Sequence, residues 1–338
     1  MTVKLGLDVH AGDVVVCRQD DGRLPKPSRR MSVEQLVKLV RELVQSGVKV
    51  ESCYEAGPCG YNLHRGLMLA GASNRVVVPR RWDPEGRRVK TDQRDARELC
   101  DALERYLRGN HSAFSVVVVP TEEQEQRRAV GRQRLMLVKE RQRCVVRGHG
   151  LMLLAGVRAP AGWWRARGWQ ALAPQLPAPL RARVETWQRQ AVQLDGELAK
   201  WSEQVEAFGQ RQGVIKGVGA LTTGLLAMEV LDWHRFRGRR QVAGYTGLCP
   251  CEHSSGTRRR QGSISKHGNP RLRHLLIETV WRLLKWQPAY PPLRKLRAAS
   301  GSRARKRMAV AVARQLAIDL WRIHTRCCPA EQLGLRWA

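Results

Sequence analysis

Four acidic residues in the first third of the chain are spaced as a carboxylate site requires. Asp8 and Glu55 each end an apolar, strand-like run. Acids at strand ends lie at the edge of a sheet, where parallel-type sheets build their sites. Asp92 and Asp95 are three residues apart, so on a helix they share one face. Clustered carboxylates repel one another unless cations neutralise them, which predicts a site for Mg²⁺ (or Mn²⁺).

A metal site of this kind could act on a phosphodiester. Two Mg²⁺ ions roughly 4 Å apart would stabilise both the attacking and the leaving oxygen. In the alternative interpretation, the strand-end acids only solvate turns, and Asp92 and Asp95 interact with the helix dipole. That alternative could explain any one of these acids, but four of them in one domain favour the metal site.

The elements that must position the four acids alternate between strands and helices. Strands are predicted at residues 3–9, 13–18, 48–54 and 75–78, and helices at 32–46, 61–70 and 91–106. Thr91 is expected to cap the helix that carries Asp92 and Asp95. This order predicts a mixed sheet covered by helices, and therefore an α/β N-terminal domain over residues 1–115.

The next segment, residues 116–211, is predicted to be a helical arm. Residues 121–155 and 181–208 indicate two long polar helices, and the break between them is rich in Pro and Trp. This pattern is typical of an antiparallel coiled coil. The arm could be a solvated spacer, or it could serve oligomerisation or grip nucleic acid. Its tryptophans, Trp163 among them, could stack on unpaired bases, or they could be core or interface residues.

Residues 212–338 are predicted to form a compact, mainly helical C-terminal domain that holds most of the positive charge. The chain has 338 residues, 60 Lys+Arg and 30 Asp+Glu, with a formal net charge of +30. Residues 1–125 have a net charge of +2, and residues 126–338 one of +28. Because guanidinium groups match phosphate geometry, the composition favours a nucleic-acid partner over an acidic protein or a membrane surface.

Candidate phosphate contacts lie in several segments of this domain. Lys216, Gly217 and Gly219 form a Gly-x-Gly turn before the predicted helix 223–230, where backbone N–H groups could bind a phosphate. The turn resembles a helix-hairpin-helix grip, and an ordinary helical turn is the alternative. Arg235, Arg237, Arg239 and Arg240 flank a glycine-containing loop, and another basic run precedes the predicted helix 308–324. The further expected contacts are Arg258, Arg259, Arg260, Lys266, Arg305, Lys306 and Arg307.

The cysteines and the hydropathy exclude several other classes of protein. The nine cysteines are scattered, as expected for reduced thiols. The run Cys249–His253 lacks a second ligand pair at zinc-finger spacing, which argues against a structural zinc ion. No run of 18 or more uncharged apolar residues exists, so we expect no transmembrane helix and no membrane partner.

At these residues the sequence resembles a known family. The set Asp8, Glu55, Asp92 and Asp95 resembles the DEDD tetrad of a RuvC-like, ribonuclease-H-type nuclease domain. The runs GLCPCEHSSG (247–256) and ISKHGNP (264–270) are similar to the second signature of the bridge-RNA-guided DEDD insertion-sequence transposases, or bridge recombinases. Tetrad, arm, turn and Ser-Gly element follow in that family's order over nearly the whole chain. The cysteines at positions 249 and 251 depart from the expected pattern.

The resemblance implies an RNA-guided recombination mechanism. A guide (bridge) RNA would pair with donor and target DNA, and a composite site of the four acids and a C-terminal serine would cut and rejoin strands. The implied serine precedes Gly256 and is therefore Ser255, with Ser254 as its nearest rival. A serine oxygen that attacks phosphorus holds the strand covalently. The arginines at 258–260 and Lys266 could neutralise the charge that develops on the phosphate.

Recombination joins two duplexes and needs more than one active site, so we expect a homo-oligomer, either a dimer or a tetramer. The resemblance implies a tetramer of paired dimers. Because Met1–His10 lacks the basic-then-apolar pattern of a signal peptide, we expect a cytoplasmic, prokaryotic protein that associates with the nucleoid when it acts. Whether Ser255 and the acids of one site come from the same chain stays open. Two other functions compete with this one: a metal-dependent RuvC-like junction nuclease without a serine step, and a non-catalytic nucleic-acid-binding protein. The intact tetrad argues against a non-catalytic binding protein. The junction nuclease would leave the Ser-Gly element without a role.

Overall fold

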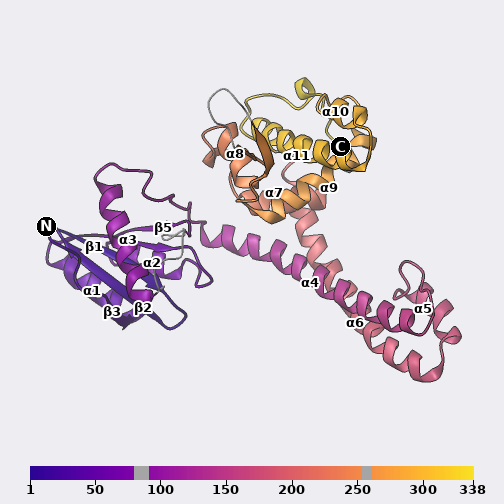
Figure 1. Cartoon of the computed structure of the whole chain (residues 1–338), viewed down its shortest axis with the longest axis horizontal. Helices are drawn as coiled ribbons and strands as arrows, with labels where there is room; N and C mark the ends of the chain where they lie inside the picture. The colour runs from indigo at the N-terminus through magenta and orange to yellow at the C-terminus, as the bar shows by residue number, and fades with distance from the viewer. Residues whose placement is uncertain (80–90, 253–259) are drawn as a thin grey trace. The chain divides into compact units, whose positions relative to one another are not determined.

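The computed structural model describes residues 1–79, 91–252 and 260–338. The chain divides into two compact units, Met1–Val119 (unit 1) and Pro120–Ala338 (unit 2). Figure 1 shows the mixed sheet of unit 1 and the helices of unit 2. None of the helices in the described ranges is long and apolar enough to cross a membrane.

Unit 1 is built on a mixed five-stranded sheet with strand order β3-β2-β1-β4-β5. The first three strands pair antiparallel, whereas β1, β4 and β5 run parallel. The strands are β1 (Thr2–Val9), β2 (Asp13–Asp20), β3 (Arg29–Ser32), β4 (Lys49–Glu55) and β5 (Ser73–Val77). The predicted α/β organisation with a mixed sheet is confirmed. Strand β3 was not predicted, because its four residues include two arginines and show no apolar alternation.

Helices cover both faces of this sheet. Alternate residues of β1, among them Leu5 and Leu7, pack with α1 (Val33–Gln45) and α2 (Asn62–Leu69) in one core. The opposite face packs against α3 (Asp92–Leu107). The side chain of Thr91 accepts a hydrogen bond from the Arg94 N–H, so the predicted cap of α3 is confirmed.

Gly6 in the middle of β1 lets α3 lie directly on the sheet. A Cβ atom at this position would meet the Ala96 carbonyl oxygen at 2.2 Å and the Cys100 nitrogen at 2.4 Å. Both atoms belong to the α3 backbone, so they cannot move aside as a side chain could. The absence of a side chain at Gly6 therefore sets the distance between strand and helix.

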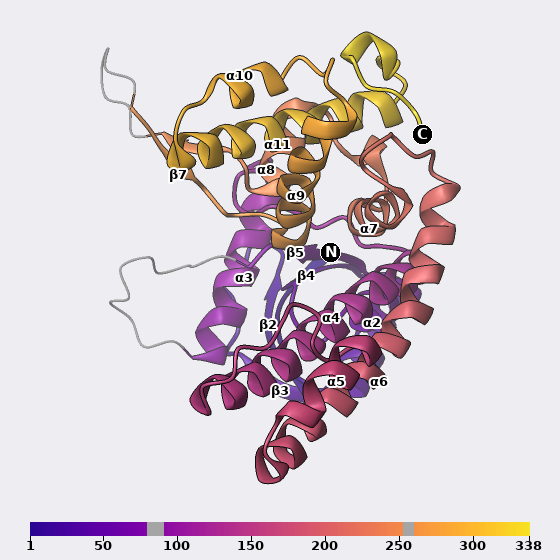
Figure 2. The same cartoon turned by 90° about the vertical axis from the view of Figure 1, so that its right-hand side faces the viewer.

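Unit 2 begins with two long helices that lie side by side, α4 (Glu122–Leu154) and α6 (Ala178–Gln210) (Figures 1 and 2). The segment between them contains a short helix, α5 (Ala166–Leu172), which was not predicted. Trp163 is buried there against Gly148, and the Trp164 indole N–H donates to Asp195 at 2.9 Å. These two tryptophans are core residues of the arm, and of their two predicted roles the structure supports packing.

The rest of unit 2 buries one large apolar core. Its helices are α7 (Ala220–Val230), α8 (Arg239–Thr246), α9 (Pro270–Trp286), α10 (Leu293–Ala298) and α11 (Ser302–His324), and β6 (Pro250–Glu252) pairs with β7 (Gln261–Ile264). Two predicted helix starts were wrong. Helix α7 begins at Ala220 rather than Thr223, and α11 begins at Ser302 rather than Met308. Arg305, Lys306 and Arg307 therefore lie within a helix rather than before it.

Glu229 of α7 joins several helices of unit 2 through a buried carboxylate. It accepts hydrogen bonds from Arg132 of α4 at 3.1 Å and from Asn269, the cap of α9, at 2.7 Å. Its backbone carbonyl accepts a further hydrogen bond from the Tyr245 hydroxyl of α8 at 3.1 Å. Burial alone would raise the pKa of Glu229, but the bonds from Arg132 and Asn269 and the nearby Arg271 charge hold it below its usual range.

We predict that Gly6→Ala destabilises unit 1, because the added methyl group meets the α3 backbone. Overpacking of this kind costs about 1–3 kcal/mol or more. Urea unfolding with hydrogen exchange of the α3 amides measures the effect. Gly12→Ala is the matched control, since its Cβ would have no neighbour within 4 Å. Equal losses in the two variants would contradict the packing role of Gly6.

We predict that Glu229→Gln lowers the free energy of unfolding by about 2 kcal/mol at pH 7. Because the folded-state pKa of Glu229 is depressed, its contribution is present above the unfolded pKa and is lost as pH falls through the folded value. The difference between wild type and variant should therefore shrink between about pH 5 and pH 3 in urea titrations. Glu140→Gln, which removes an exposed ion pair with Arg143, should change stability little at any pH.

Candidate active site

Asp8 and Glu55 lie next to each other at the carboxyl ends of two parallel strands. Leu7 of β1 pairs with Tyr54 of β4, so Asp8 and Glu55 are the next residues in the same register. Neighbouring strands are about 4.8 Å apart. Both acids also belong to the α3 face of the sheet, because they are two residues beyond Gly6 and Cys53, which contact α3. The strand-end prediction thus corresponds to a pair of half-buried carboxylates on one face.

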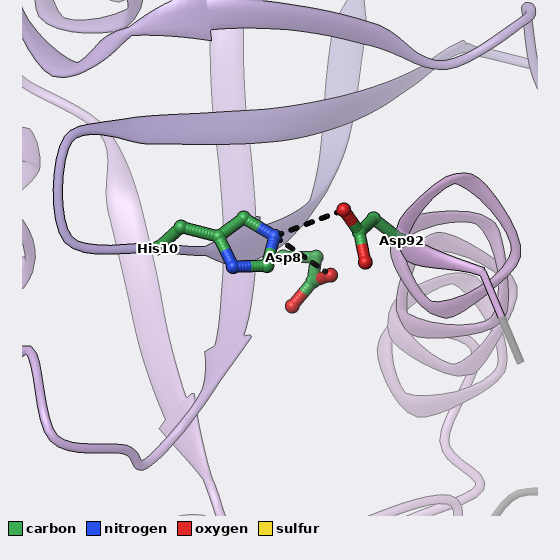
Figure 3. A group of neighbouring side chains, drawn as sticks. All are labelled: Asp8, His10 and Asp92. Carbon is green, nitrogen blue, oxygen red and sulfur yellow. Dashed lines mark ion pairs between the residues drawn. The ribbon is translucent and has the colours of Figure 1, made fainter.

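Asp92, the first residue of α3, lies near Asp8, and the imidazole of His10 points toward both carboxylates (Figure 3). The Nε2 atom of His10 is 3.4 Å from Asp8 Oδ2 and 3.3 Å from Asp92 Oδ2. This nitrogen is shielded from solvent and makes no hydrogen bond of regular geometry. Ligand atoms of the three residues all lie within 4.8 Å of one another.

Asp95 is placed by the same geometry beside the Glu55 strand. The Cys53 thiol donates to the Leu99 carbonyl of α3 at 3.4 Å, so these two residues lie side by side at the same height along the strand and the helix. Two residues along a strand advance about 6.6 Å. Four residues along a helix advance about 6 Å. Because α3 runs opposite to β4, Glu55 and Asp95 are therefore expected at the same height, one step beyond Cys53 and Leu99. Asp8 and Asp92 are related in the same way to Gly6 and Ala96.

Arg30 of β3 supplies positive charge to this edge. Its guanidinium donates to Asp92 Oδ2 at 2.7 Å and to Asp13 Oδ2 at 2.9 Å. The side chain is 56% exposed and that of Asp92 is 43% exposed, so solvent reaches this pair. Arg30 therefore lowers the repulsion between the carboxylates through a contact that another cation could replace.

Sequence reasoning missed His10 and Arg30 as members of the site. His10 directly follows the predicted strand 3–9, and its position two residues beyond Asp8 was a usable signal. Arg30 gave no such signal, because it reaches the site through the unpredicted strand β3. Strand register and the packing of α3 place Glu55 and Asp95 toward the same edge as Asp8 and Asp92. The contacts of His10 at 3.4 and 3.3 Å join only Asp8 with Asp92 among the described residues.

The predicted Gly-x-Gly turn precedes α7, with Gly219 as the residue before its first turn. Gly217 and Gly219 have φ values of +85° and +78°, which favour glycine. A Cβ on Gly217 would lie 2.7 Å from Trp286, so that glycine also serves packing. Lys216 is exposed, and its N–H donates to the Arg336 carbonyl at 2.9 Å. Phosphate binding at this turn stays a prediction.

The other predicted site residues divide into described and undescribed positions. Arg260 is exposed before β7, and Lys266 has a φ of +57° and donates its N–H to the Gly247 carbonyl at 3.2 Å. Exposed positions at the start of α11 are occupied by Arg305, Lys306 and Arg307. The positions outside the described residues are Ser254, Ser255, Arg258 and Arg259.

Comparison with known proteins identifies the family. The sequence model of the transposase IS116/IS110/IS902 family matches residues 213–295. The putative transposase y4rJ of Sinorhizobium fredii is 33% identical over 298 residues, which cover 79% of this chain and 75% of that relative. The chain belongs to the IS116/IS110/IS902 family of transposases. The predicted resemblance to insertion-sequence transposases is confirmed at this level.

Two further relatives extend the similarity over most of the transposase. The transposase for insertion sequence element IS1111A of Coxiella burnetii is 28% identical, covering 95% of this chain and 89% of the relative. The transposase for insertion sequence element IS1328 of Yersinia enterocolitica is 26% identical, covering 88% and 89%. The chain is thus a DNA transposase of the IS110 family of insertion sequences.

The acidic edge of this transposase has the chemistry of a divalent-cation site. Carboxylate oxygens suit Mg²⁺ and Mn²⁺, and the imidazole of His10 could add a nitrogen ligand, which Mn²⁺ accepts more readily than Mg²⁺. The unbonded Nε2 of His10 between two carboxylates fits such an ion. Arg30 would compete with the ion for Asp92 Oδ2.

We predict that Mn²⁺ binds this edge and that Asp8→Asn and Asp92→Asn each weaken binding at least tenfold, on the order of a lost metal contact. The electron paramagnetic resonance signal of free Mn²⁺ measures the bound fraction. Arg30→Gln should instead strengthen binding, because it removes a competing cation. Asp101→Asn, an exposed position on the same helix, is the control and should have no effect.

Proposed function

We propose that this transposase cuts and rejoins DNA strands with the four carboxylates of unit 1 and with Ser255, at places selected by a guide RNA. The observation that supports the proposal most is the convergence of Asp8 and Asp92 on His10 at the sheet edge. A mixed sheet with helices on both faces and acids at its carboxyl edge also agrees with the RuvC-like, ribonuclease-H-type domain that the sequence suggests.

The proposed chemistry is a pair of transesterifications. The Ser255 oxygen attacks a DNA phosphorus, a serine–phosphate bond forms, and the bond from phosphorus to the leaving DNA oxygen breaks. The serine proton is released and the departing oxygen is protonated. Rejoining reverses these events with the hydroxyl of another DNA end. Mg²⁺ or Mn²⁺ held by the carboxylates would stabilise the charge on the leaving oxygen.

The proposed partners follow from charge and from the resemblance. Residues 126–338 have a net charge of +28, which suits donor DNA, target DNA and a bridge RNA. Recombination joins two duplexes and needs more than one active site, so we propose a homo-oligomer, either a dimer or a tetramer. The exposed arginines and lysine at the start of α11 and the turn before α7 would contribute phosphate contacts.

A junction nuclease without a serine step is the second candidate. It is favoured by one observation: the joined ligands Asp8, His10 and Asp92 all lie within unit 1. The two functions differ in whether a covalent protein–DNA bond forms, and a denaturing gel can detect that bond.

We predict that Ser255→Ala lowers strand transfer by a factor on the order of 10³ or more and abolishes the covalent protein–DNA product. The assay uses the transposase purified with its flanking DNA, end-labelled donor DNA and any RNA that co-purifies. Asp8→Asn should lose the same product through weaker metal binding. Ser263→Ala, in β7, is the matched control and should retain both activities.

The outcomes separate the two functions. Cleavage that persists in Ser255→Ala without a covalent product would support the junction nuclease. A covalent product that is lost only in Ser254→Ala would move the nucleophile by one residue. Sequencing of the co-purified RNA tests the guide: a single discrete RNA supports guidance, and heterogeneous RNA that salt removes argues against it.

A further inference from the structure

Unit 2 contains a cavity of about 1030 Å³ between α8 and α11, and no predicted site residue lines it apart from Arg239 and Arg240. Arg314 and Arg322 of α11 line its other side. Four guanidinium groups thus surround one hollow. A smaller hollow of about 410 Å³ is lined by Arg237 and the start of α8, and it shares Arg239 and Arg240 with the larger one.

The positive charge of this cavity is largely uncompensated. Arg239, Arg240 and Arg314 are exposed, and none of their guanidinium groups forms a hydrogen bond or ion pair with another residue in the described part of the chain. Arg322 is 3.6 Å from Asp319, but that buried carboxylate also accepts hydrogen bonds from Tyr290 and Gln315. Guanidinium groups held together in this way repel one another unless an anion lies between them.

The floor of the cavity is apolar. Ala243 of α8 and Ile318 and Trp321 of α11 line the cavity, and the spacing from Arg314 to Ile318 and Trp321 places those three on one side of the helix. A phosphate group alone has no apolar surface that could pack against Ile318 and Trp321. An unpaired nucleotide suits both parts of the cavity, because the face of its base can pack against apolar side chains and its phosphate can bind the arginines.

We propose that this cavity, hereafter the α8–α11 cavity, binds a single-stranded segment of nucleic acid. The arginines contact successive phosphates, and an unstacked base lies against Ile318 and Trp321. A duplex is disfavoured, because its bases are stacked inside and only its sugars and phosphates would meet the apolar floor. The two hollows that share Arg239 and Arg240 fit a strand of more than one nucleotide. The inference rests on the proposed function only in that this function supplies the DNA or RNA from which the bound strand comes.

The first test measures binding by fluorescence anisotropy with the full-length transposase and EDTA present. Oligonucleotides of roughly 12 nucleotides suit the site sizes of single-strand binding proteins. The double variant Arg240→Gln/Arg314→Gln should bind single strands on the order of tenfold more weakly, with a salt slope smaller by about 1.4. Arg294→Gln/Lys295→Gln removes the same charge from exposed positions of α10 and should bind as the wild type does.

The second test locates the strand by photocrosslinking. A single strand that carries 5-iodouracil bases should crosslink to Trp321, which trypsin releases in the peptide of residues 315–322 between two arginines. Parallel DNA and RNA strands show which nucleic acid the cavity prefers. The proposal is wrong if crosslinks leave this peptide unmodified, if both double variants weaken binding equally, or if duplex binding falls as much as single-strand binding.

These measurements do not depend on strand transfer. Asp8→Asn and Ser255→Ala should retain single-strand binding even where they abolish the covalent product. If the Arg240/Arg314 variant loses single-strand binding and the wild type forms no covalent product, nucleic-acid binding at the cavity is supported and the serine mechanism is wrong. An unchanged unfolding temperature confirms that the double variant is folded.

Discussion

The close contact between α3 and β1 at Gly6 fixes where the carboxylates of unit 1 lie. Strand and helix backbones meet there with no room for a Cβ atom, so this contact sets the distance between β1 and α3. Two residues of strand and one turn of helix advance by nearly equal distances, about 6.6 and 6 Å. The next level therefore places Asp92 opposite Asp8, and the parallel strand β4 places Glu55 toward Asp95. Packing brings together groups that would otherwise separate.

Much of unit 1 could be predicted because its rules are local. Apolar runs marked the strands, and Thr91 marked the start of α3. The ends of parallel strands coincide in space, so acids at two such ends could be expected to meet. The contact of His10 with Asp8 and Asp92 could not be predicted in the same way, because it depends on how the hairpin after β1 turns the imidazole over the sheet edge.

Unit 2 shows where sequence reasoning reaches its limit. The first turns of α11 carry basic residues without apolar periodicity, so the helix start was placed six residues too late. The α8–α11 cavity is formed by segments about 75 residues apart in the chain, such as Arg240 and Arg314. A charge count detects the excess of arginine but not its gathering around an apolar floor. Only the packing of α8 against α11 makes those side chains neighbours.

The partners of each charged group separate structure from function in this transposase. Glu229 is buried and holds fixed bonds from Arg132 and Asn269, so its charge is satisfied within the fold and serves to join helices. Asp92 is half-exposed, and its contacts with Arg30 and His10 leave room for exchange with another cation. Arg314 has no protein partner in the described part of the chain and faces a hollow. A metal ion or a nucleic acid can bind the charges whose partners are replaceable or missing, because these charges make no fixed favourable interaction within the fold.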